Sequence, residues 1–358
     1  LLPQDMRHFR QVESIFRDRC QKWGYSEIRT PTLEYMHLFT SAGTLTPGML
    51  SRVYSFLDWD GWSGERVVMR PEGTIPAARL YLDCLKDSPL ARLFYVENIF
   101  AFEETASRER WQCGAELIGG TAPLADVELV MLALEVLAKL GLGPVEVRLS
   151  HAGLLRALLE QMGLKPEERA RIFDRILEGD PKAIQEVSSR TPSSRKLMSL
   201  MLELKGAGPE YLRNLDASLA RSVPQLQPCL KDFMRVAEML SQVGRSYIVD
   251  IASAHGFEYY TGVIFQFYLA GQKIGGGGRY DDLIAGVGGP PTPASGFALY
   301  LDDLMALAQD MCPDTPPRVE VRADTSANRS TEQRFEVARL LRDAGYQAEL
   351  DLGVASTP

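Results

Sequence analysis

Long hydrophobic runs are missing from this 358-residue chain. No stretch approaches the roughly 18 consecutive apolar residues that a membrane helix needs, and the first residues do not follow the pattern of a secretion signal. Cysteine is scarce and scattered: the five cysteines include no Cys-x-x-Cys pair, which favours reduced thiols over disulfides or zinc ligands. We therefore expect a cytoplasmic protein without a membrane anchor.

The chain also has few histidines and fewer basic than acidic residues. The four histidines lie far apart without metal-ligand spacing, so we expect no metal and no other cofactor. The net charge of −8 argues against broad nucleic-acid binding, although a local basic groove stays possible. Neither a G-x-G-x-x-G nor a G-K-[ST] phosphate loop occurs, which excludes Rossmann and P-loop folds.

The hydrophobic pattern that is present predicts an α+β fold, an antiparallel sheet flanked by helices. Apolar residues at three- and four-residue steps predict a helix over residues 4–23, and similar patterns predict helices over 75–85, 126–140, 297–311 and 331–344. Thr74 is a candidate cap for the second of these helices. Alternating or β-branched runs predict strands over residues 25–28, 53–56, 66–69, 91–102, 112–117, 145–149, 247–251, 263–268, 318–321 and 347–350.

The order of these elements predicts three parts. Residues 1–150 and 245–311 form the core, and residues 151–244, which are helical with polar loops, form an insertion. The third part is a tail at 312–358. It begins with a linker at 312–317 that contains three prolines and continues as a small β-α-β fragment. This tail is too short for a sizeable core of its own.

A tyrosine pair and a glycine run mark the predicted binding pocket. Tyr259 and Tyr260 precede one strand, and glycines fill residues 275–278 in the next. Aromatic rings supply apolar walls with hydroxyl tips, and glycines allow a ligand to approach the backbone closely. The alternative is a plain hairpin with a mobile glycine loop.

Six segments together resemble class II aminoacyl-tRNA synthetases and, in particular, histidyl-tRNA synthetase. The resemblance covers residues 1 to about 310, and the tail weakly. The segments are Thr30–Pro31 with Glu34 for motif 1, 100–103 for motif 2, 296–304 for motif 3, and 70–74, 258–262 and 277–281 for the histidine-specific motifs.

The resemblance implies a site that can still recognise histidine. A histidine ligand needs a carboxylate and neutral acceptors for its ammonium group and partners for both imidazole nitrogens. By resemblance, the ammonium ligands are Glu72, Thr74 and Gln112, the imidazole ligands are Glu116 and Tyr260, and the pocket is shaped by Tyr259, Gly276 and Gly277.

The resemblance also implies that the adenylation machinery is lost. Three positions at which the synthetases carry arginines have other residues here: Ala101, His255 and Asp303. A charged hydrogen bond contributes roughly 1.5–3 kcal/mol, so three losses lower the rate by roughly 10³ to 10⁶. The alternative is that Arg108, Arg110 or Arg279 replaces one of them.

This combination resembles the regulatory-subunit branch of the superfamily, which implies no catalytic residues and no aminoacylation. The implied partners are the short catalytic subunit of ATP phosphoribosyltransferase in a hetero-octamer, a second copy through motif 1 at residues 30–35, and L-histidine as feedback effector. Because the tail resembles only the beginning of an anticodon-binding domain, we do not expect tRNA binding. The rival hypotheses are a divergent histidine-activating ligase and a free-standing RNA-binding or sensor module.

Overall fold

The computed structural model describes residues 1–41, 52–59, 64–102, 107–160, 164–177, 182, 205–219, 224–251, 259–308, 316–322 and 331–352. The chain divides into two compact units, Leu1–Met311 and Cys312–Pro358.

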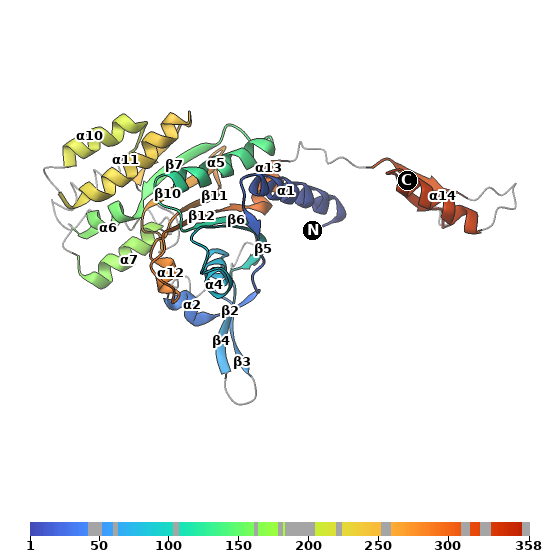
Figure 1. The fold of residues 1–358 in the computed structure, drawn as a ribbon, viewed down its shortest axis with the longest axis horizontal. Helices are drawn as coiled ribbons and strands as arrows, with labels where there is room; N and C mark the ends of the chain where they lie inside the picture. Colours follow the sequence, from blue (N-terminus) through green and yellow to red (C-terminus); the bar gives the residue numbers. More distant parts are fainter. Residues whose placement is uncertain are drawn as a thin grey trace. The chain divides into compact units, whose positions relative to one another are not determined.

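A nine-stranded sheet forms the centre of the first unit (Figure 1). All neighbouring strands run antiparallel except β1 with β5 and β7 with β9, which confirms the predicted α+β fold. In spatial order the strands are β1 (Ser26–Glu27), β5 (Ala91–Phe100), β6 (Glu109–Ile118), β12 (Ala294–Tyr300), β11 (Gln272–Arg279), β10 (Val263–Leu269), β7 (Glu146–His151), β9 (Ile248–Asp250) and β8 (Lys205–Ala207).

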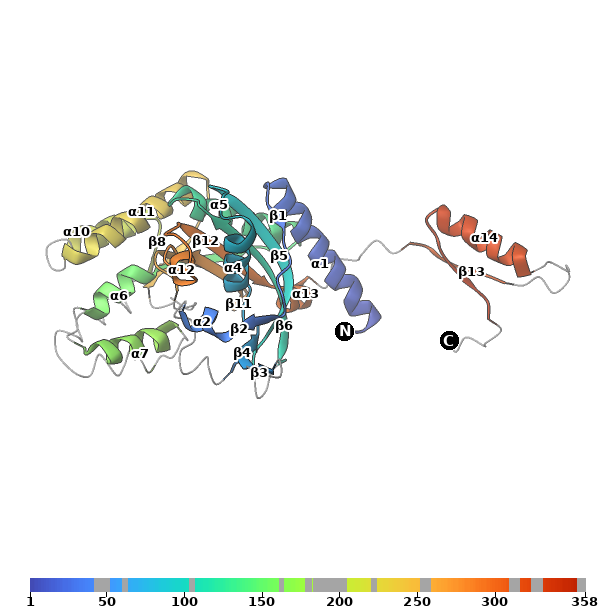
Figure 2. The same ribbon diagram turned by 60° about the horizontal axis from the view of Figure 1, so that its bottom comes forward.

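Helices cover one face of this sheet with the main hydrophobic core. The amphipathic α1 (Pro3–Lys22) inserts Phe16 between Phe94 of β5 and Phe297 of β12, with ring centroids 6.0 and 6.4 Å apart. The helices α5 (Leu124–Lys139) and α11 (Gln227–Gln242) pack on the same side. On the opposite side lies α4 (Thr74–Cys84), with the short α12 (Leu283–Gly286) against it (Figure 2).

The predicted tyrosine–glycine hairpin is formed by β10 and β11, joined by a turn at Ala270 and Gly271, both with positive φ. The glycine run lies inside β11, so the mobile-loop alternative is wrong. A Cβ atom on Gly277 would lie 2.1 Å from the carbonyl oxygen of Gly296 in β12. One on Gly278 would lie 2.9 Å from the ring of Tyr260. These glycines therefore permit close packing of the neighbouring strand and of the tyrosine.

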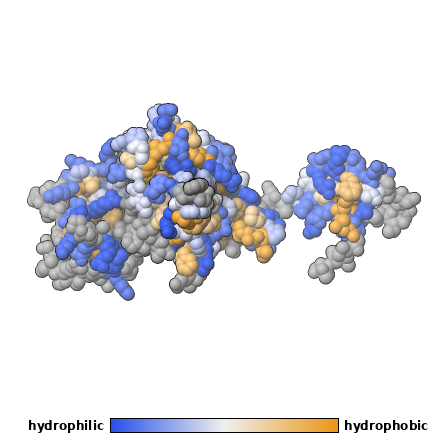
Figure 3. All heavy atoms as spheres, turned by 90° about the horizontal axis from the view of Figure 1, so that it is seen from below, coloured by the Kyte–Doolittle hydropathy of each residue, from blue (hydrophilic) through white to orange (hydrophobic). Residues whose placement is uncertain are grey.

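A second sheet of three strands projects from the core. It consists of β2 (Leu33–Tyr35), β4 (Gly64–Met69) and β3 (Ser55–Trp59), with β4 in the middle. Every residue of β3 is exposed, including Phe56, Leu57 and Trp59. Figure 3 views the molecule from this end, where apolar and polar surface alternate.

The remaining elements are helices of the first unit and the small second unit. The first group is α2 (Met36–Ser41), α6 (Ala152–Glu160), α7 (Pro166–Leu177), α10 (Pro209–Leu219) and η1 (Pro224–Leu226). The second unit contains β13 (Arg318–Val321) and β14 (Gln347–Leu350), which pair in parallel, and α14 (Thr331–Asp343) between them. The division of the first unit into a core and a helical insertion stays a prediction.

Two local predictions are wrong. The helix predicted over 297–311 is present only as the shorter α13 (Leu301–Leu307), because residues 297–300 belong to the strand β12 and residues 309–311 lie outside the described residues. Because β12 lies between β6 and β11, it is largely buried, and its nearly continuous apolar run has no strand alternation. Thr74 is not the cap of α4, since its hydroxyl group bonds to Glu116 instead.

None of the helices in the described part of the chain is long and apolar enough to cross a membrane. The same residues contain no group of three or more His, Cys, Asp or Glu side chains that could hold a metal ion.

Candidate functional site

The site builds on the face of the central sheet that carries Gln112, Gly114 and Glu116 of β6, here called the site face. Side chains of a strand alternate between faces, so these three residues point the same way. The register with β12 places Glu116 opposite Gly296 and Gln112 opposite Tyr300. A Cβ atom on Gly296 would lie 1.8 Å from Glu116 Oε2, so the glycine makes room for the carboxylate.

Glu116 is a buried carboxylate that accepts hydrogen bonds from three hydroxyl groups. Thr74 Oγ1 lies 2.9 Å and the Tyr95 hydroxyl 3.1 Å from Oε1, and the Tyr280 hydroxyl donates to Oε2. Only Thr74 and Glu116 were predicted as ligands. Tyr280 lies in one of the motifs identified in the sequence, but its bond to Glu116 could be recognised only from the strand register. Nothing in the β5 sequence distinguishes Tyr95 from an ordinary core residue.

Glu72 lies immediately before α4 and accepts the backbone N–H groups of Thr74 and Ile75 at 2.7 and 2.8 Å. The Tyr259 hydroxyl also donates to it, at 3.4 Å. The carboxylate thus satisfies two of the otherwise unpaired N–H groups at the helix start. Thr74 connects the two acids, since its N–H bonds to Glu72 and its hydroxyl to Glu116.

Burial dominates the electrostatics of both acids. It raises the pKa of Glu116 to about 8 and that of Glu72 to about 7, although the hydrogen bonds described above oppose this shift. An uncompensated carboxylate inside a protein favours its neutral form. A cationic ligand placed between these groups would reverse this preference and ionise them.

The other predicted binding residues lie on β6, on β11 and before β10, and all but Gly277 lie toward this pair or on its side of the sheet. Gln112 is 3% exposed, and its Oε1 atom has no hydrogen-bond partner among the described residues. The Tyr259 ring packs edge-on against Tyr260 at 5.1 Å and against Tyr280 at 5.6 Å. By alternation, Gly276 lies on the site face, whereas Gly277 lies on the face that the helices cover.

The positions of the expected arginines differ in what the structure shows. Ala101 follows β5, and His255 falls outside the described residues. Asp303, in α13, accepts the Arg110 guanidinium at 2.8 Å and the Gln272 amide at 3.3 Å. Burial raises the pKa of Asp303, and the Arg110 charge opposes this. This carboxylate therefore neutralises an arginine where the resemblance implies a free positive charge.

The alternative arginines have other partners. Arg279 is buried and pairs with Asp126 at 2.8 Å and Asp281 at 2.8 Å, which makes it a structural residue of the core. Arg108 lies over the Phe102 ring at 4.8 Å. Arg110 is the candidate on the site face, and it is held over the Tyr300 ring at 4.5 Å.

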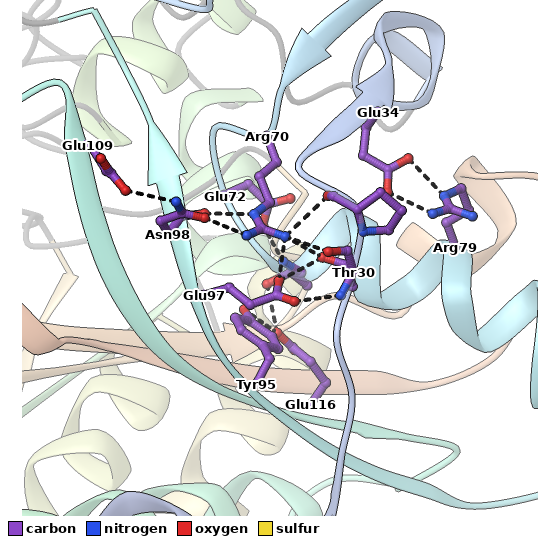
Figure 4. Close-up of polar contacts among 12 residues, drawn as sticks. Thr30, Glu34, Arg70, Glu72, Arg79, Tyr95, Glu97, Asn98, Glu109 and Glu116 are labelled. Atoms are coloured by element: carbon purple, nitrogen blue, oxygen red, sulfur yellow. Dashed lines mark hydrogen bonds and ion pairs between the residues drawn. The ribbon is translucent and has the colours of Figure 1, made fainter. Parts of the chain in front are cut away.

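A buried ion pair supports the site from the side of the three-stranded sheet (Figure 4). Arg70 Nη1 lies 2.9 Å from Glu97 Oε2 and donates to the Thr30 carbonyl oxygen at 2.8 Å, and Nε and Nη2 donate to Asn98. Glu97 also accepts the N–H and hydroxyl of Thr30. The segment before β2 is thereby fixed to β5 and to the loop that carries Glu72.

Known proteins with similar sequences and structures identify the family to which this fold and site belong. The histidyl-tRNA synthetase family model matches residues 1–304. A solved structure from Bacillus halodurans, described as an ATP phosphoribosyltransferase regulatory subunit/histidyl-tRNA synthetase, has 27% identity and a TM-score of 0.81, covering 99% of this chain and 92% of the other. Fold and site face together define a class II aminoacyl-tRNA synthetase-like protein.

Curated relatives narrow this class. An ATP phosphoribosyltransferase regulatory subunit of Dehalococcoides mccartyi is 50% identical over 354 residues, which is 98% of this chain and 85% of the relative. A histidine–tRNA ligase of Methanocaldococcus jannaschii is 33% identical over 317 residues, 87% of this chain and 74% of the relative. The chain belongs to the histidyl-tRNA synthetase family and, within it, to the branch of ATP phosphoribosyltransferase regulatory subunits.

Proposed function

We propose that this chain is a non-catalytic regulatory subunit of ATP phosphoribosyltransferase, which supports the first step of L-histidine biosynthesis in the cytoplasm and transmits feedback by histidine. The relatives at 50% identity carry this name. The structural observation that favours it over a ligase is the Arg110–Asp303 pair. Adenylation requires positive charge to offset the charge of the reacting phosphates, and at this position a carboxylate cancels it.

The acids of the site face support histidine as the effector. Glu72 and Glu116 accept hydrogen bonds from backbone N–H and hydroxyl groups of the described residues. Buried acids held by neutral donors in this way are suited to an ammonium group and an imidazole N–H. For feedback, histidine must bind one state of the complex better than the other.

The assembly we propose is a homodimer through residues 30–35 that joins short catalytic subunits in a hetero-octamer. In β2 the side chains alternate: Glu34 is buried against Arg79 at 2.8 Å, whereas Leu33 and Tyr35 are each 46% exposed. Apolar side chains presented by a strand that is anchored in this way are suited to contact a second copy.

The test is to mix the purified chain with a short catalytic subunit and to measure complex formation and phosphoribosyl transfer with and without L-histidine. We expect activity to rise on mixing and to fall with histidine. Glu116→Gln should weaken the histidine effect while complex formation persists, whereas Glu109→Gln, an exposed glutamate bonded to Asn98, should leave both unchanged. Absence of complex formation and activation would exclude the proposal.

The second candidate is a divergent histidine-activating ligase. It is favoured by the intact Glu72–Thr74–Glu116 cluster and by relatives named histidine–tRNA ligase. Histidine-dependent exchange of pyrophosphate into ATP separates the two. Measurable exchange would establish the ligase and remove the non-catalytic reading.

A further inference from the structure

We infer that Arg110 binds the carboxylate of the amino-acid ligand, with Tyr300 and Asp303 positioning its guanidinium. The inference rests on the proposed amino-acid effector. It concerns the ligand carboxylate, for which the resemblance implies only His255 as a partner, at a position where the synthetases carry an arginine.

Arg110, Gln112 and Glu116 stand in one row on β6. They are separated by two and four residues, so they share a face, at about 7 and 13 Å along the strand. Glu116 marks the buried end of the row, while the side chain of Arg110 is 39% exposed. A ligand whose side chain reaches Glu116 therefore has its other end toward Gln112 and Arg110.

The neighbouring strand brings the guanidinium close to Gln112. Tyr300 of β12 is the direct cross-strand partner of Gln112, and directly opposite residues have Cβ atoms about 5 Å apart. Because the Arg110 guanidinium lies over the Tyr300 ring, and Tyr300 is paired with Gln112, the cation lies on the sheet face to which Gln112 belongs. The aromatic ring fixes the planar cation by stacking.

These two side chains match the two charges on the α-carbon of an amino acid. Gln112 Oε1 is a buried acceptor without a partner among the described residues and requires a donor, which an ammonium group supplies. Arg110 is the adjacent cation and suits a carboxylate, which a guanidinium can bind through two nitrogens. Glu116, farther along the row, remains for a cationic or N–H-bearing side chain.

Asp303 adds selectivity. It accepts from one terminal nitrogen, Nη2, while a guanidinium carries five N–H donors on three nitrogens. The pair has no net charge, so a singly charged carboxylate can share the guanidinium, whereas a triphosphate meets the repulsion of Asp303. The arrangement therefore selects a zwitterionic amino acid and disfavours a nucleotide.

Calorimetric titration of the full chain with L-histidine and with histamine, which lacks the carboxylate, tests the inference. The wild type should bind histidine about ten- to a hundredfold more tightly than histamine, which is the contribution of one charged hydrogen-bonded pair. Arg110→Gln should lower histidine affinity to the level of histamine and leave histamine binding unchanged. Arg108→Gln, the matched arginine control just before β6, should keep the preference.

Retention of the histidine preference in Arg110→Gln would overturn the inference, as would equal binding of both ligands by the wild type. The melting temperature of each variant shows that the fold is intact, as expected for a partly exposed arginine. Activation of the short catalytic subunit by the same preparations is a separate readout. If wild-type protein activates that subunit but binds no histidine, this inference fails and the regulatory function stands.

Discussion

Glu97 of β5 and Glu116 of β6 are buried glutamates on adjacent strands of one sheet face, and their surroundings differ in charge. Glu97 lies 2.9 Å from the Arg70 guanidinium and accepts two further bonds from Thr30. The hydrogen bonds to Glu116 in the described structure come from hydroxyl groups alone. The negative charge of Glu97 is therefore neutralised by Arg70. The charge of Glu116 would be neutralised only by a bound cation, because its described donors are neutral hydroxyl groups.

This difference separates a structural acid from a binding acid. A buried carboxylate with its own arginine has no need of a ligand, and it connects the segments that contribute to the pair. A buried carboxylate held by hydroxyl groups keeps its position in the absence of a ligand and gains from a cationic one. Two substitutions test this comparison and a third extends it to the partly exposed Arg110–Asp303 pair, in order of decreasing effect.

Arg70→Ala should have the largest effect on stability. It leaves Glu97 buried without a counter-charge, and breaking a buried pair in this way costs about 3–5 kcal/mol. Urea denaturation, monitored by circular dichroism, measures the loss. Lys22→Ala is the control, because it removes a pair with Asp18 that is exposed on both sides, and it should change the free energy of unfolding by less than about 0.5 kcal/mol. Equal losses for both variants would contradict the comparison.

Glu116→Gln should have a smaller effect that depends on pH. The folded pKa of Glu116 is raised to about 8 from an ordinary value of 4.5, so the folded state holds a proton that the unfolded state releases between these values. The contribution of Glu116 to stability should therefore be full below pH 4.5 and be lost as the pH rises through 8. The slope from this group is at most about 1.4 kcal/mol per pH unit.

The measurement for Glu116 is the difference between wild type and variant, because Glu72 and other groups titrate in the same range. Glutamine keeps a hydrogen-bond acceptor at the same place but does not titrate. The free energy of unfolding of the variant, relative to that of the wild type, should therefore increase from pH 5 to pH 8. A constant difference across this range would mean that Glu116 is already ionised in the folded protein.

Much of the site could be predicted from the sequence because its acids lie in short recognisable motifs. Glu72 and Thr74 are two residues apart, and Glu116 follows Gln112 in a strand with a clear pattern. The hydrogen bonds among Glu72, Thr74 and Glu116 connect residues that were predicted as a group. Their assignment as histidine ligands stays a prediction.

The unpredicted features depend on strand register. Arg110 and Asp303 are 193 positions apart and meet because β6 pairs with β12. The sequence pattern of β12 was interpreted as part of a helix, and with that interpretation Tyr300 could not be placed opposite Gln112. Tyr95 similarly resembles any core aromatic residue until the β5–β6 register brings it beside Gly114, where only a glycine leaves room for its ring.

The smallest effect is expected for Asp303→Asn. The Arg110–Asp303 pair is 39% and 24% exposed at its two side chains, and a pair of this kind contributes less than about 1 kcal/mol to stability. The matched control is Asp302→Asn, since Asp302 accepts the Trp111 N–H at 2.9 Å and does not pair with Arg110. Denaturation should show a small change for both variants.

Only Asp303→Asn should add a net positive charge beside Tyr300, which should be seen as tighter, salt-sensitive binding of pyrophosphate in a calorimetric titration. Pyrophosphate affinity that rises equally in both variants would show that Asp303 has no special influence on the anion preference of this end of the sheet.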